Sequence, residues 1–243
     1  MSLVLWRPTH EELNNLNVLQ IKEALFKQAT IFQTGGFRPT EEFGESWIGK
    51  VLWGKEGENI PANFDPICTL FLYDLPYVPV ELADYQLVTI YMDFDAFNNV
   101  HMDNLAQYFK INCYQVLDEL QKIDKQSNNI KSFPLAPILI NNDTPSWEDS
   151  DSIGPEIENA ILRLESEEDI EYYEDIVEKI YSTHKVGGYP SFTQGGITFG
   201  DDHPFVFQIS SDEKACFNIV DSGSFYFFYN QEKQDWIVYC DFY

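Results

Sequence analysis

Short runs of aromatic and β-branched residues recur along this chain, and they predict a protein built mainly from strands. The runs are bounded by Gly, Pro, Asn or Asp, which favour turns. Prolines 76 and 79 separate two of them and lack the N–H that a ladder needs, so we do not expect these two to pair continuously. The predicted strands cover residues 31–33, 47–53, 68–75, 87–94, 108–116, 135–140, 205–212, 222–230 and 236–243.

Helical spacing is confined to a few segments. Thr9 and Glu12 have the spacing of a capping box, and the apolar residues after them predict a helix over residues 10–29, broken near Asn17. This helix should pack on a sheet. A short helix is also expected over residues 117–123.

Residues 148–178 differ from the rest in charge, because they contain thirteen Asp or Glu against a single basic residue, Arg163. Pro155 suits the first turn of one amphipathic helix. Ser166 is expected to cap a second helix. The two apolar stripes are intact, so this segment predicts a folded pair of helices with an acidic outer face. The stripes are Ile157, Ile161 and Leu164, then Ile170, Tyr173, Val177 and Ile180.

The two halves of the chain share a pattern that indicates internal duplication. Gly187-Gly188-Tyr189-Pro190 matches Gly35-Gly36-Phe37-Arg38, and hydrophobic strands follow both at similar spacing. We therefore predict a single α+β domain over residues 1–243, with mostly antiparallel strands and flanking helices. Repeat one spans about 10–145, an acidic helical connector about 150–183, and repeat two about 184–243.

These residues resemble the YwqG-like family, a group of bacterial proteins with a domain of unknown function. The match rests on Gly187-Gly188-Tyr189-Pro190 with Gln194, on Phe207-Gln208-Ile209 before Asp212, and on Gly223 before four aromatic residues. The resemblance implies a duplicated α+β fold with two intertwined repeats, and it implies no activity or cofactor. The first half departs from the pattern, since Tyr73-Asp74 stands where a Gln-Ile pair is expected.

Composition and charge narrow the classes of function. With 243 residues, 44% hydrophobic and 16% aromatic, the chain can bury a full core. A net charge of −25 argues against binding to nucleic acid or anionic membranes, and it favours a basic protein as partner or simply solubility. There is no apolar membrane span and no signal-peptide pattern, so we expect a cytoplasmic protein. The four cysteines have no C-x-x-C pair, so we expect buried free thiols.

Candidate ligand-binding residues are Tyr189, Gln194, Gln208 and Tyr226, because two amides lie among aromatic residues that could wall a groove. The alternative is structural, with both glutamines bridging backbone groups between the repeats. Candidate metal ligands are His184, Asp201 and His203, although their spacing matches no known motif. No nucleophile elbow, Walker loop or zinc-protease motif is present, so no catalytic residue and no cofactor are predicted.

The leading hypothesis is a non-enzymatic, acidic interaction protein that binds a basic protein, in the manner of an immunity protein or antitoxin. The alternative is a small-ligand-binding or metal-dependent hydrolytic protein with its site in the cleft between the repeats. A purely structural subunit is a third possibility.

Overall fold

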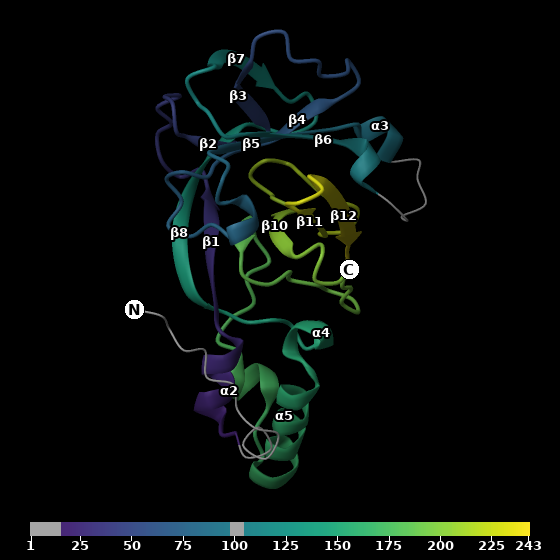
Figure 1. Cartoon of the computed structure of the whole chain (residues 1–243). Helices are drawn as coiled ribbons and strands as arrows, with labels where there is room; N and C mark the ends of the chain where they lie inside the picture. The colour runs from purple at the N-terminus through teal and green to yellow at the C-terminus, as the bar shows by residue number, and fades with distance from the viewer. Residues whose placement is uncertain (1–15, 98–104) are drawn as a thin grey trace.

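A ten-stranded antiparallel sheet forms the body of the molecule and curls into a half-barrel, with the helices α2 and α5 at one end (Figure 1). The structure is a computed structural model that describes residues 16–97 and 105–243. It confirms the α+β class and the mostly antiparallel strands. In sheet order the strands are β12 (Asp235–Asp241), β11 (Ser224–Asn230), β10 (Phe205–Ser210), β9 (Lys185–Gly187), β1 (Lys27–Thr34), β8 (Phe133–Asp143), β2 (Ser46–Ile48), β4 (Asp65–Phe71), β5 (Leu87–Met92) and β6 (Phe109–Tyr114).

The remaining elements flank this sheet. Strands β3 (Lys50–Lys55) and β7 (Leu120–Gln126) form a separate two-stranded ribbon. The helical elements are α2 (Val18–Leu25), η1 (Val80–Leu82), α3 (Phe94–Phe97), η2 (Leu105–Tyr108), α4 (Ser150–Ile153), α5 (Pro155–Glu168) and the π turn η3 (Tyr172–Ile176).

The first helix is shorter than predicted, because it ends at Leu25 and the chain enters β1 at Lys27. Asn17 caps α2 and forms a capping box with Gln20, which explains the break expected near this residue. The predicted capping residues Thr9 and Glu12 lie outside the described residues. The short edge strand expected over 31–33 is instead eight residues long and central, paired with β8 and β9.

Three further expectations are corrected by strand pairing. The short helix predicted over residues 117–123 is not formed, because residues 120–126 form β7 and pair with β3 along its whole length. The run 47–53 is divided at Gly49, whose φ of +71° and close approach to the Lys131 backbone leave no room for a side chain. Strands β4 and β5 do pair directly, since Pro76 and Pro79 lie in the long connection between them rather than in the ladder.

The helices form a layer with its own apolar core, separate from the core inside the half-barrel. Pro155 opens α5 as predicted, and the helix buries Ile161 and Leu164 against Ile21 and Ile176. The prediction of a second acidic helix capped by Ser166 was wrong. Ser166 lies inside α5, and the chain after α5 forms only the π turn. The layer keeps its acidic side chains outward nevertheless.

Aromatic side chains fill the half-barrel and hold its two ends together. Phe207 stacks on Phe227 with ring centroids 4.3 Å apart. Phe109, from β6 at one end of the strand order, meets Phe225 of β11 near the other end at 5.0 Å. Each such pair adds about 0.5–1.5 kcal/mol beyond area burial. The sheet therefore closes on itself through side chains.

The strand order of the ten-stranded sheet is symmetric about its two central strands, β1 and β8. Beside β1 come β9, β10, β11 and β12, and beside β8 come β2, β4, β5 and β6. In both runs a strand of three residues lies next to the central one. Each half of the chain thus contributes its first strand, β1 or β8, to the side of the sheet that the other half completes.

Two expectations from composition can be compared with the described residues. No helix among them is long and apolar enough to cross a membrane. All four cysteines are free thiols, as predicted. Cys68 and Cys240 are buried, Cys113 is partly buried, and Cys216 is exposed because it lies in the turn between Asp212 and Phe217. The expectation of four buried thiols was therefore wrong for Cys216.

Candidate functional site

Gln208 lies at the centre of a buried polar network and uses all of its amide atoms there. Its Oε1 accepts a hydrogen bond from Ser191 N at 3.0 Å. Its Nε2 donates to Thr183 O at 2.9 Å and contacts the hydroxyls of Ser191 and Ser210. Both ends of this buried amide are thus bonded within the fold. These bonds link the segment around Gly187 to β10, which is the structural role that the sequence left open.

The other three candidate ligand residues are likewise engaged in the fold. Tyr226 donates its hydroxyl proton toward Asp241 Oδ1 at 2.7 Å and lies 2.8 Å from Ser191 O. Gln194 is exposed, and its side chain donates to Phe242 O at 2.6 Å. Tyr189 is buried and donates to Leu25 O at 2.7 Å. The four side chains do not converge on one groove, although the ring of Tyr189 borders a cleft described below.

The three candidate metal ligands are not brought together. His184 lies beside Ser210 at the end of β10, where its Nδ1 accepts a bond from Ser210 N, and its Nε2 is 3.3 Å from Asp212. His203 precedes the start of β10 and lies 3.4 Å from Asp235. Six residues of extended strand therefore separate the histidines. Among residues 16–97 and 105–243, no three His, Cys, Asp or Glu side chains are placed to share a metal ion.

A buried ion pair underlies the glycine pair. Lys185 Nζ lies 2.8 Å from Asp143 Oδ2, and both side chains are almost fully buried. The same oxygen accepts the N–H of Tyr189 at 2.8 Å. Burial lowers the pKa of Lys185, and Asp143 opposes that shift. Gly188, with φ of +71°, packs so closely on this carboxylate that a Cβ would collide with it. Glycine is therefore required at position 188, because the Asp143 carboxylate leaves no room for a side chain.

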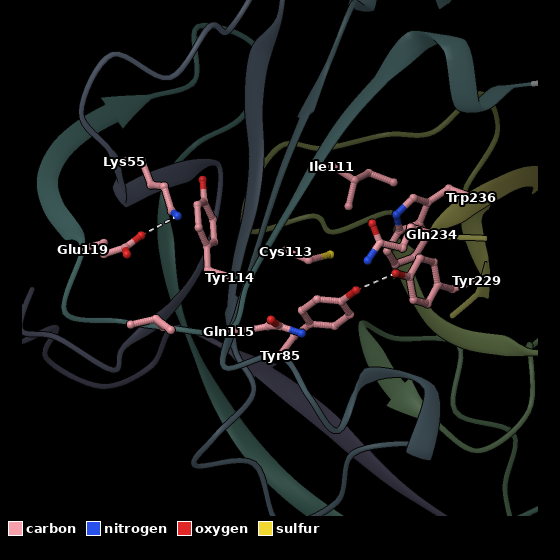
Figure 2. A pocket seen from close by; sticks show the side chains of 11 residues that line it. Lys55, Tyr85, Ile111, Cys113, Tyr114, Gln115, Glu119, Tyr229, Gln234 and Trp236 are labelled. Atoms are coloured by element: carbon pink, nitrogen blue, oxygen red, sulfur yellow. Dashed lines mark hydrogen bonds and ion pairs between the residues drawn. The ribbon is translucent and has the colours of Figure 1, made fainter. Parts of the chain in front are cut away.

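Of two clefts, one at the seam of the sheet and one beside α4, the larger lies where the ends of the sheet approach each other, and we call it the seam cleft (Figure 2). Its volume is about 460 Å³. The hydroxyls of Tyr85 and Tyr229 point toward one another across it and lie 2.6 Å apart. Its lining residues are Lys55, Tyr85, Ile111, Cys113, Tyr114, Gln115, Val116, Glu119, Tyr229, Gln234 and Trp236.

The charged and phenolic groups of the seam cleft are already paired. Lys55 lies 2.6 Å from Glu119, and the Tyr114 hydroxyl donates to Glu58 at 2.7 Å. Burial raises the pKa of Cys113 to about 12, so its thiol is protonated at neutral pH and is a poor nucleophile. The cleft therefore has volume, an aromatic wall and the exposed amides of Gln115 and Gln234, but the charged groups in its lining are paired with each other.

The smaller cleft lies between α4, the start of β1 and the segment that enters β10, and we call it the α4 cleft. Its volume is about 260 Å³. Two of the residues singled out from the sequence besides Tyr189, namely Asp201 and His203, line it. The full lining is Lys27, Asp149, Ser152, Gly188, Tyr189, Pro190, Ile197, Thr198, Gly200, Asp201, His203, Pro204, Phe205 and Phe228.

Two residues of opposite charge give the α4 cleft its chemistry. Asp149 is 3% exposed and caps α4 through Oδ1, which accepts a bond from Ser152 N, while its Oδ2 has no hydrogen-bond partner among the described residues. Lys27 places its ammonium 4.0 Å from the centre of the Tyr189 ring. Desolvation raises the pKa of Asp149 and lowers that of Lys27, and each charge partly offsets the shift of the other. Asp149 is therefore poorly solvated in this cleft, whereas the side chain of Lys27 remains exposed to solvent.

Sequence reasoning missed both of these residues. Lys27 was assigned to a helix, and Asp149 was one of many carboxylates in an acidic segment. The available signal was the short helix that begins after Asp149, because Asp is a favoured N-cap. That signal predicts one bonded oxygen and says nothing about the other.

The helical layer presents a second candidate region, which we call the acidic face. Its exposed acidic residues are Glu156, Glu165, Glu167, Glu168, Asp169, Glu171, Glu174, Asp175 and Glu178. Arg163 is the one basic residue between Glu156 and Glu178, and it is neutralised locally by Glu167 at 3.3 Å and Glu168 at 3.8 Å. Leu162 and Tyr173 are 45% and 49% exposed within the same region. The face therefore combines uncompensated negative charge with accessible apolar groups.

The described residues form an antiparallel α+β protein in which the polar groups of Gln208 and Tyr226 are buried and bonded within the fold. The chain belongs to the family described as a domain of unknown function, DUF1963, whose model matches residues 69–235. A search of the curated proteins found no significant match. The matched region includes the acidic face, Asp149 and most of the half-barrel, whereas Lys27 lies before it.

Proposed function

We propose that this protein is a non-enzymatic interaction protein that binds a basic protein partner through its acidic face. The observation that carries the proposal is the concentration of exposed carboxylates on the helical layer with Arg163 already paired. At physiological salt the field of such a face decays within about 8 Å, so it accelerates encounter and then acts only in contact. Leu162 and Tyr173 would supply apolar contact at its centre.

The partner fits the description of a basic toxin or nucleic-acid-binding protein held inactive by an acidic surface, as an immunity protein does. We infer a cytoplasmic location for this role. We also infer that the chain is a YwqG-like member of its family and arose by internal duplication. The symmetric strand order supports duplication, and in that arrangement Ile48 and Gly49 correspond to Val186 and Gly187, rather than Gly35 and Gly36 to Gly187 and Gly188.

A capture experiment with two matched variants tests the proposal. The purified chain is immobilised and exposed to a lysate of the source cell at about 50 mM and 150 mM salt, and retained proteins are identified. In the test variant Glu156, Glu165, Glu171 and Glu174 become Gln. In the control variant Glu42, Glu56, Glu213 and Glu232, which are equally exposed but lie elsewhere, become Gln.

The expected result is selective retention of a basic protein by the wild type and the control, with at least tenfold weaker binding by the test variant. The loss should be larger at low salt, because charge steering dominates there. Equal retention by both variants would show that only net charge matters and would remove the acidic face from the proposal. Failure to retain any basic protein selectively would overturn the proposal itself.

A second candidate function is small-ligand binding in the α4 cleft, favoured by the unpartnered carboxylate oxygen of Asp149 at its base. A thermal-shift screen with a library of small metabolites tests it. A ligand-dependent rise in melting temperature that Asp149→Asn abolishes is the expected result. No shift with any compound would exclude this function.

A further inference from the structure

Opposite charges face the α4 cleft without neutralising each other. Lys27 and Asp149 each perturb the other's pKa, yet they form no ion pair within the described part of the chain. In most proteins a buried carboxylate is satisfied by hydrogen bonds or by a direct ion pair. Here the Lys27 ammonium rests over the Tyr189 ring instead, and Asp149 keeps one oxygen unpartnered. The lining of the cleft therefore contains a positive group and a negative group that do not bond each other.

The same segment carries more unpartnered polar atoms than its surroundings. Asp143 Oδ1, Thr144 Oγ1 and Ser146 Oγ are buried without hydrogen-bond partners among the described residues, and they precede Asp149 along the chain. Each such atom costs about 1–3 kcal/mol if it stays unpaired. Asp149 is the member of this group that lines the cleft. Buried polar atoms without hydrogen-bond partners are thus concentrated in the segment that leads to Asp149 and this cavity.

Size and walls limit what the α4 cleft can hold. Its volume of about 260 Å³ lies below the roughly 300–1,000 Å³ typical of sites for drug-sized ligands, which excludes nucleotides and dinucleotides. Phe205, Phe228 and Ile197 provide apolar wall on the side that faces β10 and β11. The cleft thus offers the Lys27 ammonium, the Asp149 carboxylate and an apolar surface to a compound of a few heavy atoms, and Asp201 and His203 also lie in its lining.

We propose that the α4 cleft binds a small zwitterion of the α-amino-acid class, whose ammonium bonds Asp149 Oδ2, whose carboxylate pairs with Lys27 and whose apolar side chain packs on Phe228. This inference rests on the second candidate function and is independent of the acidic face. A zwitterion offers a bonding partner to the buried Asp149 carboxylate and to the Lys27 ammonium at once. A simple amine or a simple carboxylate would leave one of them unpaired.

The test compares ligands that differ by one charge. L-leucine and L-phenylalanine are titrated into the full chain by isothermal calorimetry up to about 10 mM. Each is matched by an analogue without its carboxylate, 3-methylbutylamine or 2-phenylethylamine, and by one without its amine, 4-methylpentanoate or 3-phenylpropanoate. We expect at least one amino acid to bind, and its two single-charge analogues to bind at least tenfold more weakly.

Variants then locate the site. Asp149→Asn keeps the N-cap and the size of the side chain, and Lys27→Met keeps most of its length, so both should fold as judged by circular dichroism. We expect each to weaken amino-acid binding at least tenfold. Asp151→Asn and Lys22→Met remove the same charges nearby without touching the cleft and should bind like the wild type.

Three outcomes would overturn the inference: no binding of either amino acid to the folded wild type, equal binding of the single-charge analogues, or equal effects of cleft and control variants. The metabolite screen could instead yield a ligand of another class whose binding is abolished by Asp149→Asn. In that case the α4 cleft is a ligand site, but the proposal that its ligand is a zwitterion is wrong. If neither experiment yields a ligand, both proposals fail together.

Discussion

The seam cleft is nearly twice as large as the α4 cleft, at about 460 Å³ against 260 Å³, yet the smaller one has more to offer a ligand. In the seam cleft the tyrosine hydroxyls bond each other, and Lys55 pairs with Glu119. In the α4 cleft Asp149 and Lys27 remain apart. Recognition depends on polar groups that the fold has left unused, so volume alone does not decide which of these two cavities is the better candidate for ligand binding.

The largest effect should come from the ion pair beneath the α4 cleft. Asp143→Ala leaves the Lys185 ammonium buried without its partner and frees the N–H of Tyr189. We expect a loss of about 3–5 kcal/mol in the free energy of unfolding, measured by urea denaturation. If the α4 cleft rests on this pair as described, ligand binding should be lost as well.

Two further variants show whether that loss is specific. Asp151→Ala removes an exposed carboxylate nearby and should change stability by less than about 0.5 kcal/mol. The double variant Asp143→Leu with Lys185→Met removes both charges and should recover most of the loss. A cost below about 1 kcal/mol for Asp143→Ala would show that the pair contributes little to the fold.

A smaller effect is expected in the seam cleft. Tyr85→Phe leaves the buried Tyr229 hydroxyl without its partner, which should cost about 1–3 kcal/mol of unfolding free energy. Tyr229→Phe should cost about the same. The double variant should cost clearly less than the sum of the two, because no hydroxyl is then left unpaired. Additive losses would mean that the two hydroxyls do not depend on each other, and the contrast between the clefts would weaken.

The smallest effect is a pH dependence at Asp149. Because its pKa is raised in the folded protein, the folded state holds a proton that the unfolded state releases. Its contribution therefore lowers stability as pH rises from about 4 through the raised pKa, and it stays unfavourable above that. Asp149→Asn removes this contribution while keeping the N-cap. Its stability relative to wild type should increase between pH 4 and pH 7, measured by denaturation at each pH.

The strands were predictable from sequence because aromatic and β-branched runs alternate with turn residues. Segments 68–75, 87–94, 108–116 and 205–212 all contain strands in the structure. Errors arose where long-range pairing overrode local pattern. Residues 120–126 have polar, helix-compatible composition, and only β3 makes them a strand. Residues 27–29 look like the end of a helix until β8 and β9 pair with them.

The candidate site was harder to predict for a related reason. Gln208 was singled out as an amide among aromatic residues and Tyr226 as a possible wall of a groove, but the sequence does not show whether their bonds go to the fold or to a ligand. The structure directs them inward. Asp149 looked ordinary as one of the thirteen acidic residues in 148–178, and its distinction lies in one unpartnered oxygen. Whether an atom is satisfied is a property of the tertiary arrangement.

The central position of β1 also means that this strand waits for one of its pairing partners while the chain is being synthesised. Strand β1 ends at Thr34, but β9, the neighbour that covers one of its edges, begins at Lys185, roughly 150 residues later. At about 5–20 residues per second, a ribosome needs about 8–30 s to deliver it. Until then that edge of β1 presents free N–H and C=O groups to any other nascent strand. Among the strand pairings of the ten-stranded sheet, four strands join the other six only through this late pairing of three residues.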